Sequence, residues 1–392
     1  MNLNTISISD DNIAYSDEGN CLVDANDVLW IGTNSSVIPD RVTTIGAKAF
    51  YGRTGLTSIV IPAGVTEIGE EAFAYCENLK MVTCMGETPP SYAETTFEAI
   101  PYDAVLVVPS EAAKTAYEEA NYLDYFGSII VGKSGVVANG VNWVLYSNDN
   151  GYTLEISGKG AMADYEYESA VPWSKYNVGE DIFNKINKVV VKEGITHIGK
   201  LCFARLGYYL GMDGAIDVEV SLPYDLKTIA SEAFTYSYGL KSLELPNYVE
   251  SIGNRVFYGC HNLASIVIDQ SGVSVKAYAV RNNCIINNNV VVYGCYTATI
   301  PEGVKSIGSH AFAGQERLKS ITIPSSVESI KYLEEEFGAF AYSALESITF
   351  AEGSQLKSLS PYAFYYCDAL KSIDLPNSLT TIVTERSWNA MH

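Results

Sequence analysis

The sequence predicts a strand-rich α/β protein in which stacked repeats form a solenoid, with two arrays of repeats and inserted β-hairpins. Three observations lead to this prediction. A unit of about two dozen residues recurs along most of the chain. Each copy contains a short strand pattern followed by turn signals. A longer stretch at 3–50 recurs at 263–312, so the repeat and its insertion occur together twice.

Phenylalanines at constant spacing mark the repeat. They form pairs 23 or 24 residues apart, namely Phe50 with Phe73, Phe234 with Phe257, and Phe340 with Phe364. Phe203 and Phe312 lie in the same local pattern after longer insertions. The unit reads LxxIxIPxxVxxIGxxAFxxC, with clear copies at 56–76, 240–260, 318–330 and 370–382.

The spacing within the unit predicts its local structure. Ile59 and Ile61 are two residues apart, so they share one face of a short strand, while Val60 points to the other face. Proline then ends the strand, because it cannot donate to a ladder. The glycine after the next isoleucine predicts a turn that needs a permissive backbone. These glycines are Gly46, Gly69, Gly253 and Gly308. The alanine–phenylalanine pair points inward, and stacked units bury together what one unit cannot bury alone.

The two duplicated stretches share an insertion. Each has the repeat strand, then an asparagine–cysteine pair, then strand patterns that end at an isoleucine–proline pair. The asparagine–cysteine pairs are Asn20-Cys21 and Asn283-Cys284. We expect each insertion to form a β-hairpin that projects from its array.

The unit resembles the BspA-like leucine-rich repeats of bacterial surface proteins, over most of the chain. The resemblance implies a right-handed leucine-rich-repeat solenoid. It also implies an extracellular or cell-surface location and an adhesive role, because members of this family include adhesins. The implied partner is a protein ligand, such as host extracellular matrix or another cell surface.

The repeat pattern divides the chain into two predicted domains. Residues 1–132 form an array with a β-α cap, in which Ser110 is a candidate N-cap for an alanine-rich helix. Residues 133–392 begin with a β-hairpin lead-in at 133–185, where strand patterns flank an Asn-Gly turn. Pro172-Trp173 in this lead-in resembles the approach to another array in the family. The second array follows.

Both ends of the chain carry incomplete repeats. Leu3, Ile6 and Ile8 fit the strand pattern without a preceding half-repeat, and the last copy lacks its IGxxAF segment after Thr381. We therefore expect the chain to be a fragment, or a much-altered copy, of a longer surface protein, with its export signal outside the present sequence.

The net charge of −21 excludes several classes of partner. Such a charge repels a phosphate backbone and an anionic membrane surface, and it favours a soluble monomer. No apolar run reaches the length of about 18 residues that a membrane-spanning helix needs. We expect neither nucleic acid binding nor membrane insertion.

The sequence offers no catalytic, cofactor or metal-binding motif, so we expect no enzyme activity. It lacks GxSxG, HExxH and an EF-hand loop. His197, His261 and His310 occupy variable positions of the repeat, and we expect them to be solvated or half-buried.

The cysteines predict neither a zinc site nor a required disulfide. Three of them share the position three residues after a repeat phenylalanine, and other copies have a different residue there. The cysteines are Cys76, Cys260 and Cys367, and the alternatives are Arg53, Ser237, Gln315 and Ser343. We interpret this position as small and partly buried. A Cys284–Cys295 disulfide stays open, although Thr33 stands near the second position in the first insertion.

Outward-facing strand residues form the candidate binding surface. The predicted positions are Val60, Glu244, Val267, Thr322, Thr349 and Asp374. Tyrosines also crowd the turns after the alanine–phenylalanine pair, at Tyr51, Tyr75, Tyr258, Tyr365 and Tyr366. Tyrosine supplies a large contact area at low conformational cost, although these side chains could also simply cover the edges of the repeats.

Three functions remain open at this point. The first is an adhesion module that binds proteins. The second is a carbohydrate-binding or substrate-capture module, since exposed tyrosines stack on sugar rings. The third is a structural spacer. A row of exposed aromatic residues favours the second function, and a surface without any patch favours the third.

Overall fold

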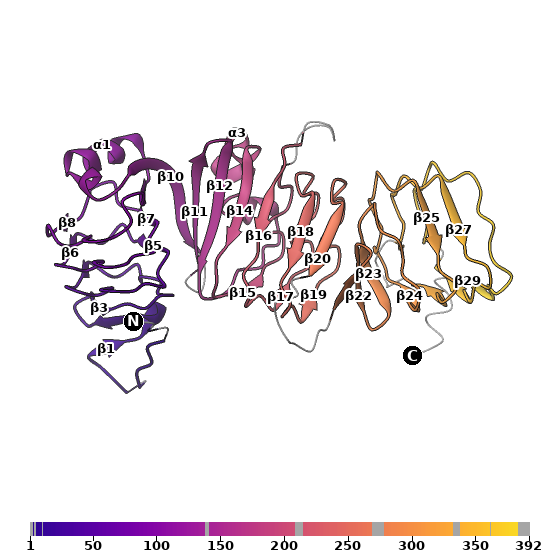
Figure 1. The fold of residues 1–392 in the computed structure, drawn as a ribbon, viewed down its shortest axis with the longest axis horizontal. Helices are drawn as coiled ribbons and strands as arrows, with labels where there is room; N and C mark the ends of the chain where they lie inside the picture. The colour runs from indigo at the N-terminus through magenta and orange to yellow at the C-terminus, as the bar shows by residue number, and fades with distance from the viewer. Residues whose placement is uncertain are drawn as a thin grey trace. The chain divides into compact units, whose positions relative to one another are not determined.

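The chain divides into two compact units (Figure 1), one of Met1–Met162 with Val189–Thr196 and one of Ala163–Lys188 with His197–His392. The computed structural model describes residues 3, 5–9, 11–137, 141–207, 215–268, 278–331, 338–360 and 362–382. Strands dominate both units and helices are few, as the sequence predicts. The predicted domain boundary at residue 132 stays a prediction.

The LxxIxI segments form parallel strands that pair from one copy to the next. In the first unit these are β5 (Ser58–Ile61), β7 (Met81–Cys84) and β9 (Val105–Val108). In the second unit β18 (Ser242–Leu245) pairs with β20 (Ser265–Ile268), and β25 (Ser320–Ile323) pairs with β27 (Ser347–Phe350). The expected copies at 3–8 and 370–375 have no strand among their described residues.

The repeats of the first unit end in the predicted strand and helix. Helix α1 (Glu111–Glu119) begins after Ser110, whose hydroxyl accepts a hydrogen bond from the Ala113 N–H at 3.1 Å. Tyr117 of this helix is fully buried in the same core as the repeat phenylalanines. The helix therefore helps to close the apolar end of the repeats.

A long strand leads from this cap into the predicted lead-in hairpin. β10 (Ser128–Val137) pairs in parallel with β9 and then antiparallel with β11 (Val141–Asn148), which pairs with β12 (Gly151–Gly158). The turn residues are Asp149 and Asn150, and not the predicted Asn-Gly pair. The Asn148 side chain accepts from the Asn150 N–H at 2.9 Å, and this local bond fixes the turn one residue earlier.

Two-residue strands form a second parallel ladder that the sequence analysis missed. Each lies at the isoleucine or its equivalent before the turn. The first unit has β4 (Thr44–Ile45), β6 (Glu67–Ile68) and β8 (Ser91–Tyr92). The second unit has β17 (Thr228–Ile229) and β19 (Ser251–Ile252), and then β24 (Ser306–Ile307), β26 (Ser329–Ile330), β28 (Ser358–Leu359) and β29 (Thr381–Ile382). β17 also pairs with the last two residues of the four-residue strand β15 (Ile195–Ile198). Two residues are too few to show a period in the sequence.

Both predicted insertions are hairpins, but they do not project as separate excursions. β2 (Leu22–Asp24) pairs with β3 (Val28–Ile31), and β22 (Cys284–Asn287) pairs with β23 (Val290–Gly294). The second strand of each hairpin then pairs in parallel with the first two-residue strand, β4 or β24. Hydrogen bonds to the ladder thus hold each hairpin against its repeats.

The remaining elements are short or lead into the repeats. They are β1 (Tyr15–Ser16), β13 (Gly160–Ala161), β14 (Ile186–Val191), β16 (Glu219–Ser221), β21 (Ala279–Arg281), α2 (Lys175–Val178), α3 (Glu180–Phe183) and the 3-10 turns η1 (Glu18–Asn20), η2 (Tyr122–Asp124) and η3 (Glu168–Ala170).

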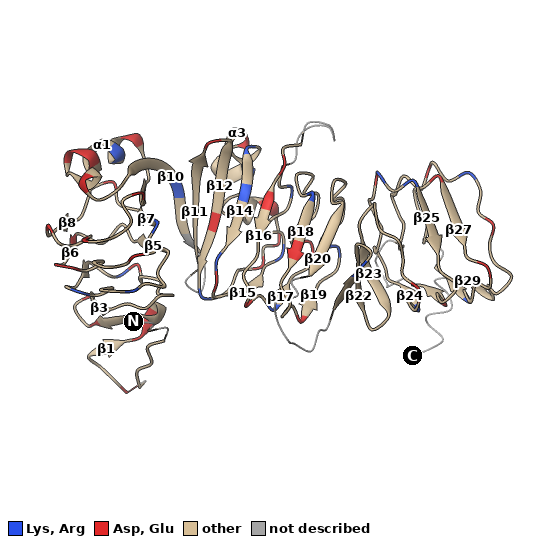
Figure 2. Cartoon of the chain, in the orientation of Figure 1, with Lys and Arg blue, Asp and Glu red and all other residues tan. Residues whose placement is uncertain are grey.

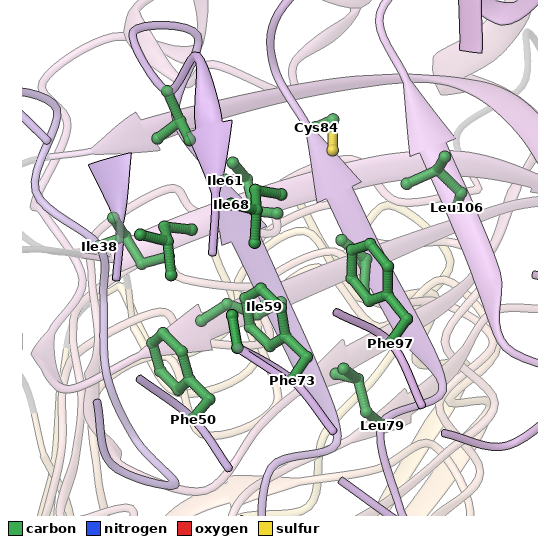
Figure 3. Packing of buried hydrophobic residues seen from close by; sticks show 14 of the residues in the cluster. Ile38, Phe50, Ile59, Ile61, Ile68, Phe73, Leu79, Cys84, Phe97 and Leu106 are labelled. Atoms are coloured by element: carbon green, nitrogen blue, oxygen red, sulfur yellow. The ribbon is translucent and has the colours of Figure 1, made fainter. Parts of the chain in front are cut away.

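Stacked phenylalanine rings form the core of the repeats, as predicted. Figure 3 shows the rings of Phe50, Phe73 and Phe97 in the first unit; neighbouring centroids are 5.0 and 5.6 Å apart. In the second unit the Phe234 and Phe257 rings are 5.6 Å apart. These five side chains are at most 1% exposed. The lead-in residue Trp173 is equally buried, and its ring lies 6.2 Å from that of Phe203.

Residues in the left-handed backbone region lie on both sides of most of these rings, two positions before and two positions after the phenylalanine. Around Phe234 they are Glu232 and Tyr236, with φ of 62° and 56°. Their N–H groups donate to carbonyl oxygens of the next copy, at 3.0 and 2.7 Å. Such a conformation costs energy for a residue with a side chain, and it persists because the stacked repeat holds it.

The predicted reason for the IG glycines is wrong. None of Gly46, Gly69, Gly253 and Gly308 has a positive φ. A side chain at Gly69 would lie 2.5 Å from the backbone nitrogen of Ala47 in the preceding copy. Close approach of two backbones, and not left-handed conformation, therefore requires glycine here.

In most copies the position three residues after the phenylalanine holds a buried hydrogen-bond donor. The thiols of Cys76 and Cys260 donate to the carbonyl oxygens of Phe50 and Phe234, at 3.1 and 3.0 Å. Ser237 makes the equivalent bond to Phe203 at 2.6 Å. We call this the donor position. Seven copies carry a donor there, namely Arg53, Cys76, Ser237, Cys260, Gln315, Ser343 and Cys367, whereas Ile100 and Leu206 follow Phe97 and Phe203. The expectation of a small, partly buried position was therefore wrong, and this shared chemistry was the signal.

The buried column of phenylalanine rings predicts that truncation of one ring lowers the free energy of unfolding. We expect Phe257→Ala to lower the free energy of unfolding by about 3–5 kcal/mol, because it leaves a cavity beside two neighbouring rings. Phe364→Ala is the matched control, since Phe364 is only partly buried and should cost less. Chemical denaturation measures both, and an equal loss from the two variants would contradict the assignment.

The donor position allows a second test. Ser237→Ala removes the bond to the Phe203 carbonyl and leaves a buried acceptor, so we expect a loss of about 1–3 kcal/mol in unfolding free energy. Ser237→Cys keeps a donor of the kind that other copies use and should lose less. If both variants unfold at the same denaturant concentration, the hydrogen bond does not explain the position.

Candidate functional site

Four of the predicted outward residues are exposed on strands of the second unit. Glu244 of β18 lies directly opposite Val267 of β20, and Thr322 of β25 lies opposite Thr349 of β27. All four side chains are exposed, and the residues beside them along each strand are largely buried. We call Glu244, Val267, Thr322 and Thr349 the exposed strand positions. Their role in binding stays a prediction.

Val60 is not exposed, which corrects the prediction for this residue. It is 5% exposed and packs with Met81, Val107 and Val144 in a small apolar cluster. Val144 belongs to β11, so the lead-in hairpin covers the outward side of the strands in the first unit. The sequence carried a signal, because Val107 also places an apolar residue at an outward position of this sheet.

Asp374 is exposed, but it does not lie on a strand. The segment around it has its apolar residues partly uncovered, and Leu375 is 41% exposed. Among the described residues no later copy packs on this segment, which accounts for the missing strand. A role for Asp374 in binding stays a prediction.

Charged side chains lie in the turns beside the exposed strands and not within β25 or β27 (Figure 2). They form ion pairs between successive copies, such as Lys241 with Asp217 at 2.6 Å and Lys319 with Glu346 at 3.0 Å. These pairs are exposed, so each contributes little to stability. Acidic residues outnumber basic ones, 46 to 25, so these pairs leave the chain strongly acidic.

The tyrosines after each phenylalanine meet along the edge of the repeats. Ring centroids of Tyr51 and Tyr75 are 5.3 Å apart in the first unit. In the second unit Tyr366 lies 5.2 Å from Tyr342 and 4.5 Å from Tyr365. Tyr366 is 57% exposed. The tyrosines pack on one another, so they cover the edge of the repeats. They also present ring surface to solvent, so contact area for a ligand is available as well.

Two of the three histidines are more deeply buried than the sequence predicted. His197 is half-buried, but His261 and His310 are only 2% and 5% exposed. Burial lowers the pKa of both, and that of His310 falls to about 4, with the nearby Arg255 charge adding to the effect. These two histidines are packing residues of the repeat edge.

All eight cysteines are free and buried, including Cys284 and Cys295. Burial raises the pKa of the Cys284 thiol to about 12, so the reactive thiolate is suppressed at neutral pH. In the described part of the chain, no group of three or more His, Cys, Asp and Glu side chains could hold a metal ion. No helix among the described residues is long and apolar enough to span a membrane.

Comparison with known proteins identifies the repeat. The model of the BspA type leucine-rich repeat region matches six copies, at residues 31–102, 217–296 and 288–386, which is more than half of the chain. The chain belongs to the BspA type leucine-rich repeat family. A search of curated proteins gave no match.

Solved structures of low identity resemble this BspA-type chain. A leucine rich cell surface protein from Faecalibacterium prausnitzii is 21% identical, with 98% of both chains covered and a TM-score of 0.40. A leucine-rich repeat protein from Bacteroides ovatus is 18% identical, covers 86% of this chain and 77% of its own, and has a TM-score of 0.32. One from Eubacterium ventriosum is 21% identical, covers 64% and 93%, and has a TM-score of 0.29. The family assignment rests on the repeat.

The buried His310 predicts a specific pH dependence. Its pKa is about 4 in the folded chain and near 6.5 when unfolded, so only the unfolded chain binds the proton between these values. The contribution of His310 is intact above about pH 6.5 and falls by about 3 kcal/mol as the pH drops to 4. His310→Asn, which suits the φ of 59°, should flatten this part of the stability profile. Denaturation at pH 7 and pH 4.5 measures it, and an unchanged difference between the two pH values would contradict the assignment.

Proposed function

We propose that this chain is an extracellular or cell-surface adhesion module, in which two right-handed leucine-rich-repeat solenoids present protein-binding surfaces without catalysing a reaction. The observation that carries the proposal is the set of exposed strand positions. Strands of stacked repeats place side chains at regular intervals on a surface that can grow with the number of copies, which suits the recognition of a large partner.

The chemistry of the exposed strand positions supports a protein partner. Glu244 supplies a carboxylate, Thr322 and Thr349 supply hydroxyl groups, and Val267 supplies an apolar contact that is 49% exposed. A mixture of apolar and polar groups is typical of protein interfaces. The neighbouring ion pairs join side chains of successive copies of the chain itself.

The exposed tyrosines favour a second candidate function, the binding of glycans. Tyr342, Tyr365 and Tyr366 form a cluster whose centroids are 4.5 to 5.6 Å apart. Partly exposed aromatic rings provide flat apolar surface with a polar hydroxyl at the edge. We propose glycan binding only for this cluster, and a protein partner remains the preferred function.

Binding of the purified chain to a panel of matrix proteins and glycans tests both functions, at low and at physiological salt. We expect saturable binding to a protein that survives physiological salt. Glu244→Ala combined with Val267→Lys should weaken it by about tenfold or more, since it removes one contact and places a charge on another.

Glu118→Ala is the matched control, because Glu118 is exposed on α1 of the first unit and is not one of the exposed strand positions. Binding to glycans alone, lost with Tyr366→Ala, would favour the second function. No binding to any member of the panel, or binding by the Glu244/Val267 variant equal to that of the native chain, would contradict the proposal.

A further inference from the structure

Each inserted hairpin is followed by a strand that ends its sheet. β5 is paired on one side by β7, and β25 is paired on one side by β27; both are terminal strands of their sheets. In the copy before each of them, the hairpin joins the ladder of two-residue strands instead. The segments at 34–38 and 298–301, which take the place of a repeat strand, are not strands. The same gap in the sheet therefore occurs twice.

A groove lies beside each of these terminal strands. In the first unit a cavity of about 350 Å³ is lined by Asn34, Ser35 and Ser36 and by Ser58 and Val60 of β5. In the second unit a cavity of about 320 Å³ lies between the segment 298–302 and β25. The two grooves occupy corresponding places, on the exit from each hairpin and along the next strand.

Backbone hydrogen-bonding groups of β5 and β25 point into these grooves. The carbonyl oxygens of Lys319 and Ile323 accept from the β27 side, from Glu346 and Ala351 N–H groups at 2.8 and 3.0 Å. Successive residues of a strand direct their backbone groups to opposite sides, so those of Ser320 and Thr322 face the groove. Thr57 and Ile61 bond in the same way to the β7 side, which directs Ser58 and Val60 outward.

On the opposite side of each gap, side chains form hydrogen bonds with backbone groups. In the second unit the Ile266 N–H of β20 donates to the Asn283 side chain at 3.4 Å, and the Thr297 hydroxyl donates to the Ala264 carbonyl. In the first unit the Ile6 N–H donates to the Asn20 side chain at 2.8 Å. Asn20 and Asn283 are the asparagines of the two asparagine–cysteine pairs. On one side of each gap, side chains of the chain itself bond to backbone groups. On the other side, the backbone groups of β5 or β25 face a groove.

The sequences of the terminal strands favour strand addition. β5 reads SIVI and β25 reads SITI, so both are rich in β-branched residues and carry no charge. Proteins usually protect a sheet edge with lysine, proline or a bulge, and none of these lies within the four residues of either strand. Glu302 lines the second groove, Lys192 and Glu193 both line the first, and the chain as a whole carries −21.

We propose that each groove binds an extended peptide segment with cationic ends, which adds as a strand along the outer edge of β5 or β25. Main-chain hydrogen bonds would supply affinity. The net negative charge of the chain, with Glu302 at the second groove, would favour positive charge at the ends of the peptide. This inference concerns the backbone edges of β5 and β25. The Glu244/Val267 variant that tests the proposed function leaves both edges unchanged, so either proposal can fail without the other.

The test uses the full chain and a fluorescein-labelled peptide of sequence KTVTVTK, followed by fluorescence anisotropy. We expect a saturable rise on titration with the chain. The same peptide with N-methyl groups on alternate residues should not bind, because it cannot pair along an edge. Val60→Pro with Thr322→Pro should weaken binding at least about fivefold, the loss of one or two hydrogen bonds. Val60→Ala with Thr322→Ala keeps the backbone donors and should lose less binding than the proline variant. Glu118→Ala, on α1 and outside both grooves, should bind like the native chain.

Three outcomes would overturn the proposal. They are no saturable binding of the parent peptide, equal binding of the N-methylated peptide, and equal binding of the proline variant with unchanged unfolding. Sedimentation supplies a further check, because a dimer of the chain that the proline substitutions abolish would assign the grooves to a second copy. The N-methylated peptide needs no variant, so the test holds even where a proline variant does not fold.

Discussion

The stacking of one phenylalanine ring on the next is the constraint on which the rest of the structure depends. Ring centroids of successive copies lie 5.0 to 5.6 Å apart, close to the distance between neighbouring strands. Each copy must therefore advance by one strand spacing and bring its ring back into the column. The left-handed residues on both sides of the ring make these sharp turns, and their N–H groups bond to the next copy. The donor position then satisfies the phenylalanine carbonyl of the preceding copy, which the column has removed from water.

The sequence predicted what depends on periodicity and failed where a contact between copies decides the structure. Spacing located the inward phenylalanines and the longer strands of the repeats, and residue type located the N-cap at Ser110. It misassigned Gly69, because the approach of the Ala47 backbone belongs to another copy. It also misassigned Val60, because the hairpin that covers this residue begins some 80 residues later in the chain. The donor position was visible in the sequence only as a shared chemistry among unlike residues, which a search for one residue type does not detect.

The inserted hairpins show how such a column tolerates a break in one of its sheets. The copy that carries each hairpin still supplies Phe50 or Phe312 to the column and a two-residue strand to the ladder. It omits only the longer strand. Asn20 and Asn283 replace one side of that missing strand with side-chain hydrogen bonds, which explains why the same asparagine recurs in both insertions. The core thus continues through the insertion while the sheet is interrupted.

Contacts between copies separate the residues that hold the repeats together from the residues that are exposed on the strands. Inward isoleucines, phenylalanines and donor residues pack against or hydrogen-bond to the neighbouring copies. Side chains such as those of Glu244 and Val267 make no core contacts, because they point outward from strands whose inner faces are buried. In the first unit the equivalent face packs against β11, so Val60 belongs to the core. Exposure of an outward position is therefore set by the segment that succeeds the repeats in the chain, and a binding surface can form only where no such hairpin covers the strands.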